Sequence, residues 1–139
     1  MTSGAARQPR PTIDLARISL AVRDYDEAVA FFTGALGFEV VEDEPRGGGK
    51  RWVVVAPPGA RVGVLLAKAV TPEQQARVGD QTGGRVLLFL HTDDFAAAHA
   101  RMQAHGVRFV EEPRHEAHGK VAIFLDPYGN RFELIEPAR

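Results

Sequence analysis

The residues of this chain that could carry out acid-base or metal chemistry are five histidines and a scatter of carboxylates. His91 ends the apolar run 86–90, and Glu133 lies within the apolar run 132–135 near the C-terminus. An imidazole beside a carboxylate can act as a general base, a substrate contact or a metal ligand. We therefore take His91 and Glu133 as candidate catalytic residues. The alternative for His91 is a structural histidine at the rim of the core.

A second group of histidines lies in the sequence Arg114-His115-Glu116-Ala117-His118. The helical H-E-x-x-H metal motif needs two histidines four residues apart on one helix face, whereas these are three apart and follow a proline. We expect a solvated loop here. The absence of cysteine excludes thiolate catalysis and disulfide bonds, and it fits a cytoplasmic location.

Aromatic side chains could form a binding surface for a conjugated ligand. Trp52 and Phe89 are the candidates that we take as ligand-binding residues, and Phe124 and Tyr128 are further possibilities. Phe89 shares a strand with His91 and Leu87, and alternation along that strand predicts that all three side chains lie on one face, toward a cavity. Packing in the core is an equally good interpretation for each aromatic residue.

The elements that would position these residues follow a repeated pattern. The run 18–22 predicts a strand, and a helix is expected to begin at Asp24, whose capping box closes at Glu27, and to end at Gly37. Strands are then predicted at 38–41, 51–55 and 62–66, separated by turns rich in glycine and proline.

The same order returns about seventy residues later. A strand at 86–90 precedes a helix that begins at Asp94 and ends at Gly106, and strands follow at 107–110, 121–125 and 132–135. Aligning the two copies pairs Val41-Glu42 with Val110-Glu111. The repeat predicts an α+β fold of two βαβββ modules in tandem, at 12–67 and 85–137, joined by a connector at 68–84. We expect the connector to be a linker rather than a lid, and 1–11 to be a flexible extension.

Composition limits the kinds of partner. The chain has 139 residues, 45% of them hydrophobic, which suits one compact domain. Its formal net charge of −1 provides no overall field for nucleic acid, and no apolar run is long enough to span a membrane. We expect a small-molecule partner, with no nucleic-acid or membrane binding.

The closing sequence Asp126-Pro127-Tyr128-Gly129-Asn130-Arg131-Phe132-Glu133-Leu134, together with the two modules, resembles the vicinal-oxygen-chelate superfamily of glyoxalases, bleomycin resistance proteins and extradiol dioxygenases. The resemblance covers about residues 13 to 136. It implies curved mixed sheets around a small-molecule cavity, which is often completed by dimerisation. We therefore expect a homodimer.

The resemblance also implies four metal-ligand positions, which fall here on Arg17, Gly63, Leu87 and Glu133. Only Glu133 can bind a hard divalent ion, because the other three side chains offer no lone pair or carry a fixed positive charge. We expect no cofactor, although a divalent metal at a rebuilt site remains an alternative. Arg17 is expected to replace the metal by pairing with Glu133, within a chain or across a dimer, and by holding a ligand; otherwise it reaches solvent.

Three functions follow from these observations. The first is binding of a small organic molecule, such as an antibiotic or a reactive metabolite, without a metal. The second is a metal-dependent lyase or dioxygenase with a site rebuilt from His91 and Glu133. The third is a scaffold with no ligand.

Overall fold

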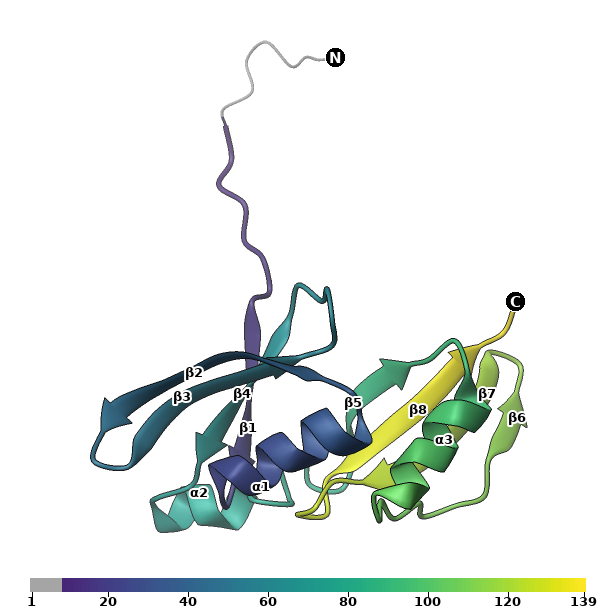
Figure 1. Cartoon of the computed structure of the whole chain (residues 1–139). Coiled ribbons are helices and arrows are strands. Elements are labelled where there is room, and N and C mark those ends of the chain that lie inside the picture. The colour runs from purple at the N-terminus through teal and green to yellow at the C-terminus, as the bar shows by residue number, and fades with distance from the viewer. Residues whose placement is uncertain (1–8) are drawn as a thin grey trace.

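Two four-stranded mixed sheets form the molecule, and each contains one copy of the repeat (Figure 1). The computed structural model describes residues 9–139, so most of the extension predicted at 1–11 lies outside the described residues. The strand order β1-β4-β3-β2 in the first sheet is repeated as β5-β8-β7-β6 in the second, which confirms the tandem modules. The strands are β1 (Arg17–Val22), β2 (Glu39–Gly47), β3 (Lys50–Ala56), β4 (Gly63–Lys68), β5 (Val86–His91), β6 (Arg114–Glu116), β7 (Gly119–Leu125) and β8 (Arg131–Pro137).

One helix follows the first strand of each module, as the capping residues predict. Helix α1 (Tyr25–Ala30) begins at Asp24, whose carboxylate accepts a hydrogen bond from the Glu27 backbone N–H at 2.8 Å. The Glu27 carboxylate accepts from Arg23 instead of closing the predicted capping box. It widens into a π-helical turn, η2 (Phe31–Ala35), before Gly37 reverses the chain with a φ of 74°. Helix α3 (Phe95–Ala104) begins at Asp94 in the same way.

The second module departs from the prediction after its helix. The strand predicted at 107–110 is reduced to a single bridge between Phe109 and Phe124, and β6 forms instead within the segment predicted as a loop. The Glu111 carboxylate accepts a hydrogen bond from the Ile123 backbone N–H at 3.0 Å. A side chain therefore accepts the β7 backbone N–H that a neighbouring strand would otherwise accept through its carbonyl oxygen. Pro113 has no N–H and cannot extend the strand pairing.

The helices cover one face of each sheet and leave the other face open. In β3 all four residues from Val53 to Ala56 are buried, and of these Val53 and Val55 pack in the core with Val64 and Leu66 of β4. The core continues between the modules, where the Phe132 ring of β8 lies 6.1 Å from Phe32 and 6.2 Å from Phe31, measured between ring centroids. The two modules therefore share one hydrophobic interior on their helix side.

The connector also joins the modules. It contains the short helix α2 (Pro72–Arg77) and then passes the closing turn of the second module. The Gln81 backbone N–H donates to the Asn130 side-chain oxygen at 3.1 Å, and the Gln81 side-chain oxygen accepts from the Ala21 N–H at 3.0 Å. One residue of the connector thus contacts both modules. Within residues 9–139, no helix has the length and apolar character needed to cross a bilayer.

Gly79 makes the closest approach in this connection. Its φ is 80°, and a Cβ atom added there would overlap the Tyr128 carbonyl oxygen. Gly83, in the same connector, has a similar φ of 68° but no atom near its Cβ position. Gly83→Ala should therefore cost about 1 to 2 kcal/mol, the usual penalty of a left-handed residue, and Gly79→Ala about twice that or more. Chemical denaturation of both variants measures the difference, and equal losses would contradict the close packing of connector and turn.

Candidate ligand-binding site

A hollow of about 580 Å³ lies on the open face of the first sheet. Its floor comes from alternate residues of neighbouring strands, because Ser19 pairs with Leu65 and Ala21 with Ala67 in register. Trp52 of β3 adds a large, partly buried ring to the same pocket. The structure thus places Trp52 at a pocket, and its role in ligand binding stays a prediction.

The connector forms one wall of this pocket. Gln74 and Arg77 of α2 and the following Gln81 all line it, together with Lys68 at the end of β4. Of the residues that line the pocket, Lys50 could have been predicted from the sequence, because it lies two residues before Trp52 on the same strand and therefore on the same face. Nothing in the sequence placed the connector residues there, because their position depends on the tertiary contacts of Gln81 with Ala21 and Asn130.

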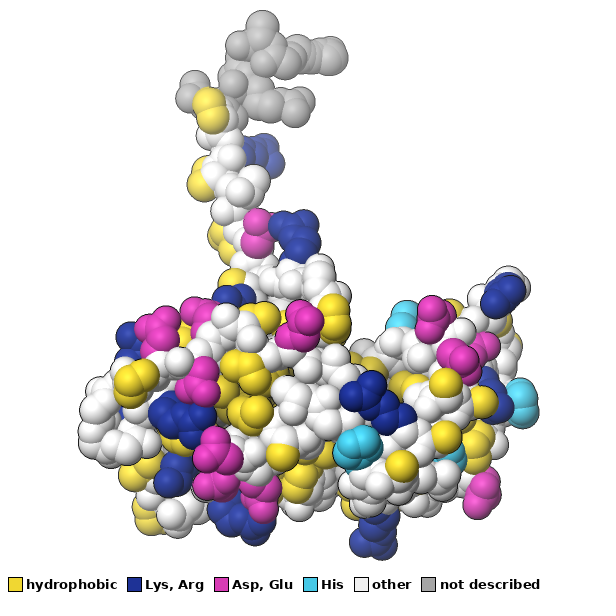
Figure 2. Space-filling model, in the orientation of Figure 1, with side chains coloured by type: hydrophobic (Ala, Val, Ile, Leu, Met, Phe, Trp, Pro, Cys, Tyr) yellow, Lys and Arg dark blue, Asp and Glu magenta, His cyan; other side chains and the backbone are white. Residues whose placement is uncertain are grey.

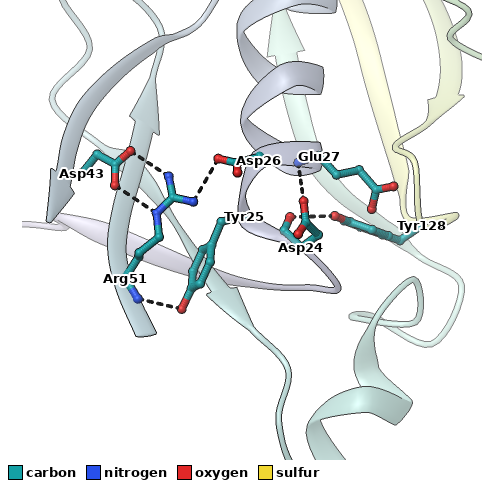
Figure 3. A network of polar contacts seen from close by, with 7 residues as sticks. All are labelled: Asp24, Tyr25, Asp26, Glu27, Asp43, Arg51 and Tyr128. Atoms are coloured by element: carbon teal, nitrogen blue, oxygen red, sulfur yellow. Dashed lines mark hydrogen bonds and ion pairs between the residues drawn. The ribbon is translucent and has the colours of Figure 1, made fainter. Parts of the chain in front are cut away.

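Arg51 is held rigidly at the edge of the pocket (Figure 3). Its guanidinium donates to Asp43 at 2.8 Å and to Asp26 at 2.9 Å. The central guanidinium carbon lies 5.1 Å from the centre of the Tyr25 ring. The hydrogen bonds to Asp43 and Asp26 raise the pKa of Arg51, and the same contact with Arg51 lowers the pKa of Asp43. These interactions connect β3 to β2 and to the start of α1.

Arg17 lies at the opposite end of the open face. It pairs in register with Gly63, but its guanidinium donates to Glu42 at 2.7 Å. This ion pair lowers the pKa of Glu42, chiefly through the hydrogen bond from Arg17. Among the described residues, the prediction that Arg17 pairs with Glu133 inside one chain is therefore wrong; a pair across a dimer stays a prediction.

Glu133 has a local partner in its own module. Its side chain is 13% exposed and lies 3.7 Å from Arg114, which also contacts Glu111 and Glu116. Hydrogen bonds to Glu111 and then Glu116 raise the pKa of Arg114. The carboxylate at the retained metal position is thus balanced by an arginine that the sequence reasoning did not identify.

The remaining candidates lie on β5. Phe89 pairs in register with Glu133, and its ring is 61% exposed. His91 is exposed at the end of the strand, beside a separate hollow of about 400 Å³. Leu87 falls at an irregularity in the register and packs against the core, so it does not continue the alternation that was expected to align it with Phe89 and His91.

A larger hollow of about 710 Å³ lies at the junction of the modules, between α1 and the turn at 126–129. Apart from Arg108, its polar side chains are already engaged: Tyr128 donates to the Asp24 carbonyl, Glu27 binds Arg23, and Asp126 accepts from Asn130. Figure 2 shows the face that carries α1 and α3, where acidic and basic side chains are interspersed rather than gathered by sign. We therefore regard the open sheet face with Trp52 as the better candidate site.

The four inherited metal positions do not fit a metal ion. A Cβ atom on Gly63 would lie only 2.6 Å from the Val54 side chain, so a ligating side chain has no room there. Arg17 is cationic and engaged with Glu42, and Leu87 has no donor atom. Among residues 9–139, no group of three or more histidine, cysteine or acidic side chains is arranged to hold a metal.

The paired βαβββ modules are the architecture that the closing sequence and the repeat predicted. Residues 14–134 match the Glyoxalase/Bleomycin resistance protein/Dioxygenase superfamily, and the chain belongs to this family.

The chain is also similar to several individual proteins. The chain is 48% identical to an uncharacterized protein of Shewanella frigidimarina (strain NCIMB 400) over 124 residues, which cover 88% of this chain and 92% of that protein. Its fold is similar to the crystal structure of UcmS2, with a TM-score of 0.77, 32% identity and coverage of 91% and 99% of the two chains. It is also similar to TnmS3, an antibiotic-binding protein from Streptomyces sp. CB03234, with a TM-score of 0.74, 31% identity and coverage of 94% and 100%.

The Arg17–Glu42 pair provides a test of the site's electrostatics. Replacing Arg17 with leucine should raise the pKa of Glu42 toward its ordinary value, because the hydrogen bond that stabilises the carboxylate is lost. Carboxyl-carbon NMR titration measures this pKa. Arg61→Leu removes a distant arginine that lies 3.6 Å from Asp14, and it should leave Glu42 unchanged. A Glu42 pKa that does not respond to Arg17→Leu would contradict the pairing.

Proposed function

We propose that this protein binds a small organic molecule, of the antibiotic or reactive-metabolite kind, on the open face of its first module. The observation that carries the proposal is the 580 Å³ pocket, whose floor combines Trp52 with the small and apolar residues Ala21, Leu65 and Ala67. A flat apolar floor beside an indole suits a planar or conjugated ligand, which can stack on the ring. The similarity to the antibiotic-binding protein TnmS3 supports the same class of ligand.

The proposed binding needs no metal. The support for this comes from the side chains at the inherited positions, of which Glu133 alone has ligating oxygens, and these lie near Arg114. One carboxylate holds a divalent ion too weakly for a catalytic centre, which ordinarily uses about three protein ligands.

Trp52 supplies a direct probe, because it is the only tryptophan in the chain. We expect planar quinones and related conjugated compounds to quench its fluorescence in a saturable way, since a stacked ligand lies against the indole. Trp52→Leu should weaken binding of the same compounds at least about tenfold, as expected for the loss of an aromatic stacking surface and its buried area. Calorimetry measures binding to the variant, which no longer has an indole signal.

Phe109→Leu is the matched control for this experiment, because it removes an aromatic ring that packs with His99 and Phe124 in the second module and does not line the pocket. Adding Mn²⁺, Ni²⁺ or Zn²⁺ should leave the affinity for these ligands unchanged. Stoichiometric metal in protein purified without chelators, or affinity that depends on added metal, would contradict the metal-independent function and favour a lyase or dioxygenase.

We further propose that two copies of the chain associate, and that the second module contributes Phe89, His91 and Glu133 to the completed cavity. Phe89 on the edge strand β5 is 61% exposed, and the repeat-related residues Val41 and Val110 are exposed as well. Apolar side chains at open sheet edges are stabilised by coverage from a partner. The acid-base role of His91 and Glu133 belongs to this proposal.

A homodimer should be visible in solution. Sedimentation is expected to give twice the mass of the chain across micromolar concentrations, a range in which stable dimers persist. Phe89→Glu should shift the equilibrium toward the monomer, because it places a charge in an apolar contact. A monomer throughout this range for the unmodified protein would overturn the proposal.

A further inference from the structure

The candidate pocket has a charge that is opposite in sign to that of the whole chain. The chain has a net charge of −1, yet four basic residues line the pocket, and no acidic residue of the described chain does. The four are Lys50, Arg51, Lys68 and Arg77. In a cleft with apolar walls, such a grouping concentrates a positive potential that the net charge does not reveal.

The four charges are not equally available to a ligand. Arg51 is balanced by Asp26 and Asp43, and Arg77 lies 3.9 Å from Asp80. Lys50 and Lys68 form no ion pair with any residue in 9–139. These two lysines therefore supply the uncompensated positive charge of the pocket.

Two glutamines of the connector add hydrogen-bond donors to the pocket, and these donors favour an anion as the lysines do. The Gln74 side-chain oxygen accepts from the backbone N–H groups of Val70 and Thr71, and the Gln81 oxygen accepts from Ala21. Because both carbonyl oxygens are occupied, each glutamine has its NH₂ group left to offer a ligand. The Tyr25 hydroxyl oxygen likewise accepts a hydrogen bond from the Arg51 backbone N–H, so its own proton is left to donate to a ligand.

We propose that the pocket selects an anion, namely a planar aromatic or conjugated molecule that carries a carboxylate or phenolate. The inference rests on the proposed function and specifies its ligand class. The ring system stacks on Trp52 above Ala21 and Leu65, while the anionic oxygens face Lys50, Lys68 and the glutamine amides. An apolar floor with a rim of donors matches an amphipathic anion, whereas a cation would meet like charges and unmatched donors.

Three compounds of nearly equal shape test the selection, namely anthraquinone-2-carboxylate, the neutral anthraquinone-2-carboxamide and the cationic 2-(aminomethyl)anthraquinone. We expect the carboxylate to bind about tenfold or more tightly than the carboxamide at low ionic strength, which corresponds to about 1.4 kcal/mol. The cation should bind most weakly. Because the lysines are exposed, the preference should shrink as salt is added. Quenching of Trp52 and calorimetry both report the affinities.

Variants of the lysines identify the source of the preference. Lys50→Gln with Lys68→Gln should reduce the carboxylate's affinity to near that of the carboxamide. Lys120→Gln is the matched control, because Lys120 lies over the Phe95 ring in the second module and does not line the pocket. This control should retain the full preference.

The outcomes separate this inference from the proposed function. Equal binding of the carboxylate and the carboxamide, or tighter binding of the cation, would overturn the anion selection and leave the ligand site standing. A preference that survives the double lysine variant would also overturn it. Failure of all three compounds to quench Trp52 or to release heat would count against the ligand site itself, and the selection would fall with it.

Discussion

A chain of hydrogen bonds that begins at one buried carboxylate holds the two modules and the pocket in place. Asp126, 5% exposed, accepts from the backbone N–H groups of Tyr128 and Asn130 and from the Asn130 side chain. Burial raises the pKa of Asp126, and these hydrogen bonds partly offset that effect. Asn130 in turn accepts from the Gln81 N–H, and Gln81 accepts from Ala21 of β1. Because an unpaired buried carboxylate is costly, this arrangement ties the closing turn of one module to the first strand of the other.

Much of this architecture could be predicted from the sequence, because it depends on local signals. Asp24 and Asp94 cap their helices in the structure as their spacing predicted, and Gly37 and Gly106 both adopt a positive φ after them. The strand predicted at 107–110 failed for a reason that no local pattern reveals. Glu111 uses its side chain to bind β7, so a contact between residues twelve apart decides the pairing.

The site was predicted less well, because its residues meet only through the tertiary fold. Trp52 was named only because it is aromatic, and the wall formed by α2 depends on the contacts of Gln81. The prediction of an Arg17–Glu133 pair, within a chain or across a dimer, rested on the expectation that repeat-related positions lie close together. In the structure each charge has a nearer partner, Glu42 for Arg17 and Arg114 for Glu133. Each pair joins two strands of one module, which the sheet of that module already brings close together.

The loss of the metal positions and the character of the pocket are consistent with each other. In the superfamily that the sequence resembles, a divalent ion draws in the paired oxygens of a substrate. Here Gly63 has no room for a ligand, but the same open face has lysines and amide donors at its other end. Donors of this kind also bind electron-rich oxygens, although each is weaker than a metal and acts without polarising a bond strongly. Under the proposed function, these donors would hold the oxygens of a ligand, whereas the inherited positions, with Gly63 closed off and Arg17 paired with Glu42, supply no set of metal ligands.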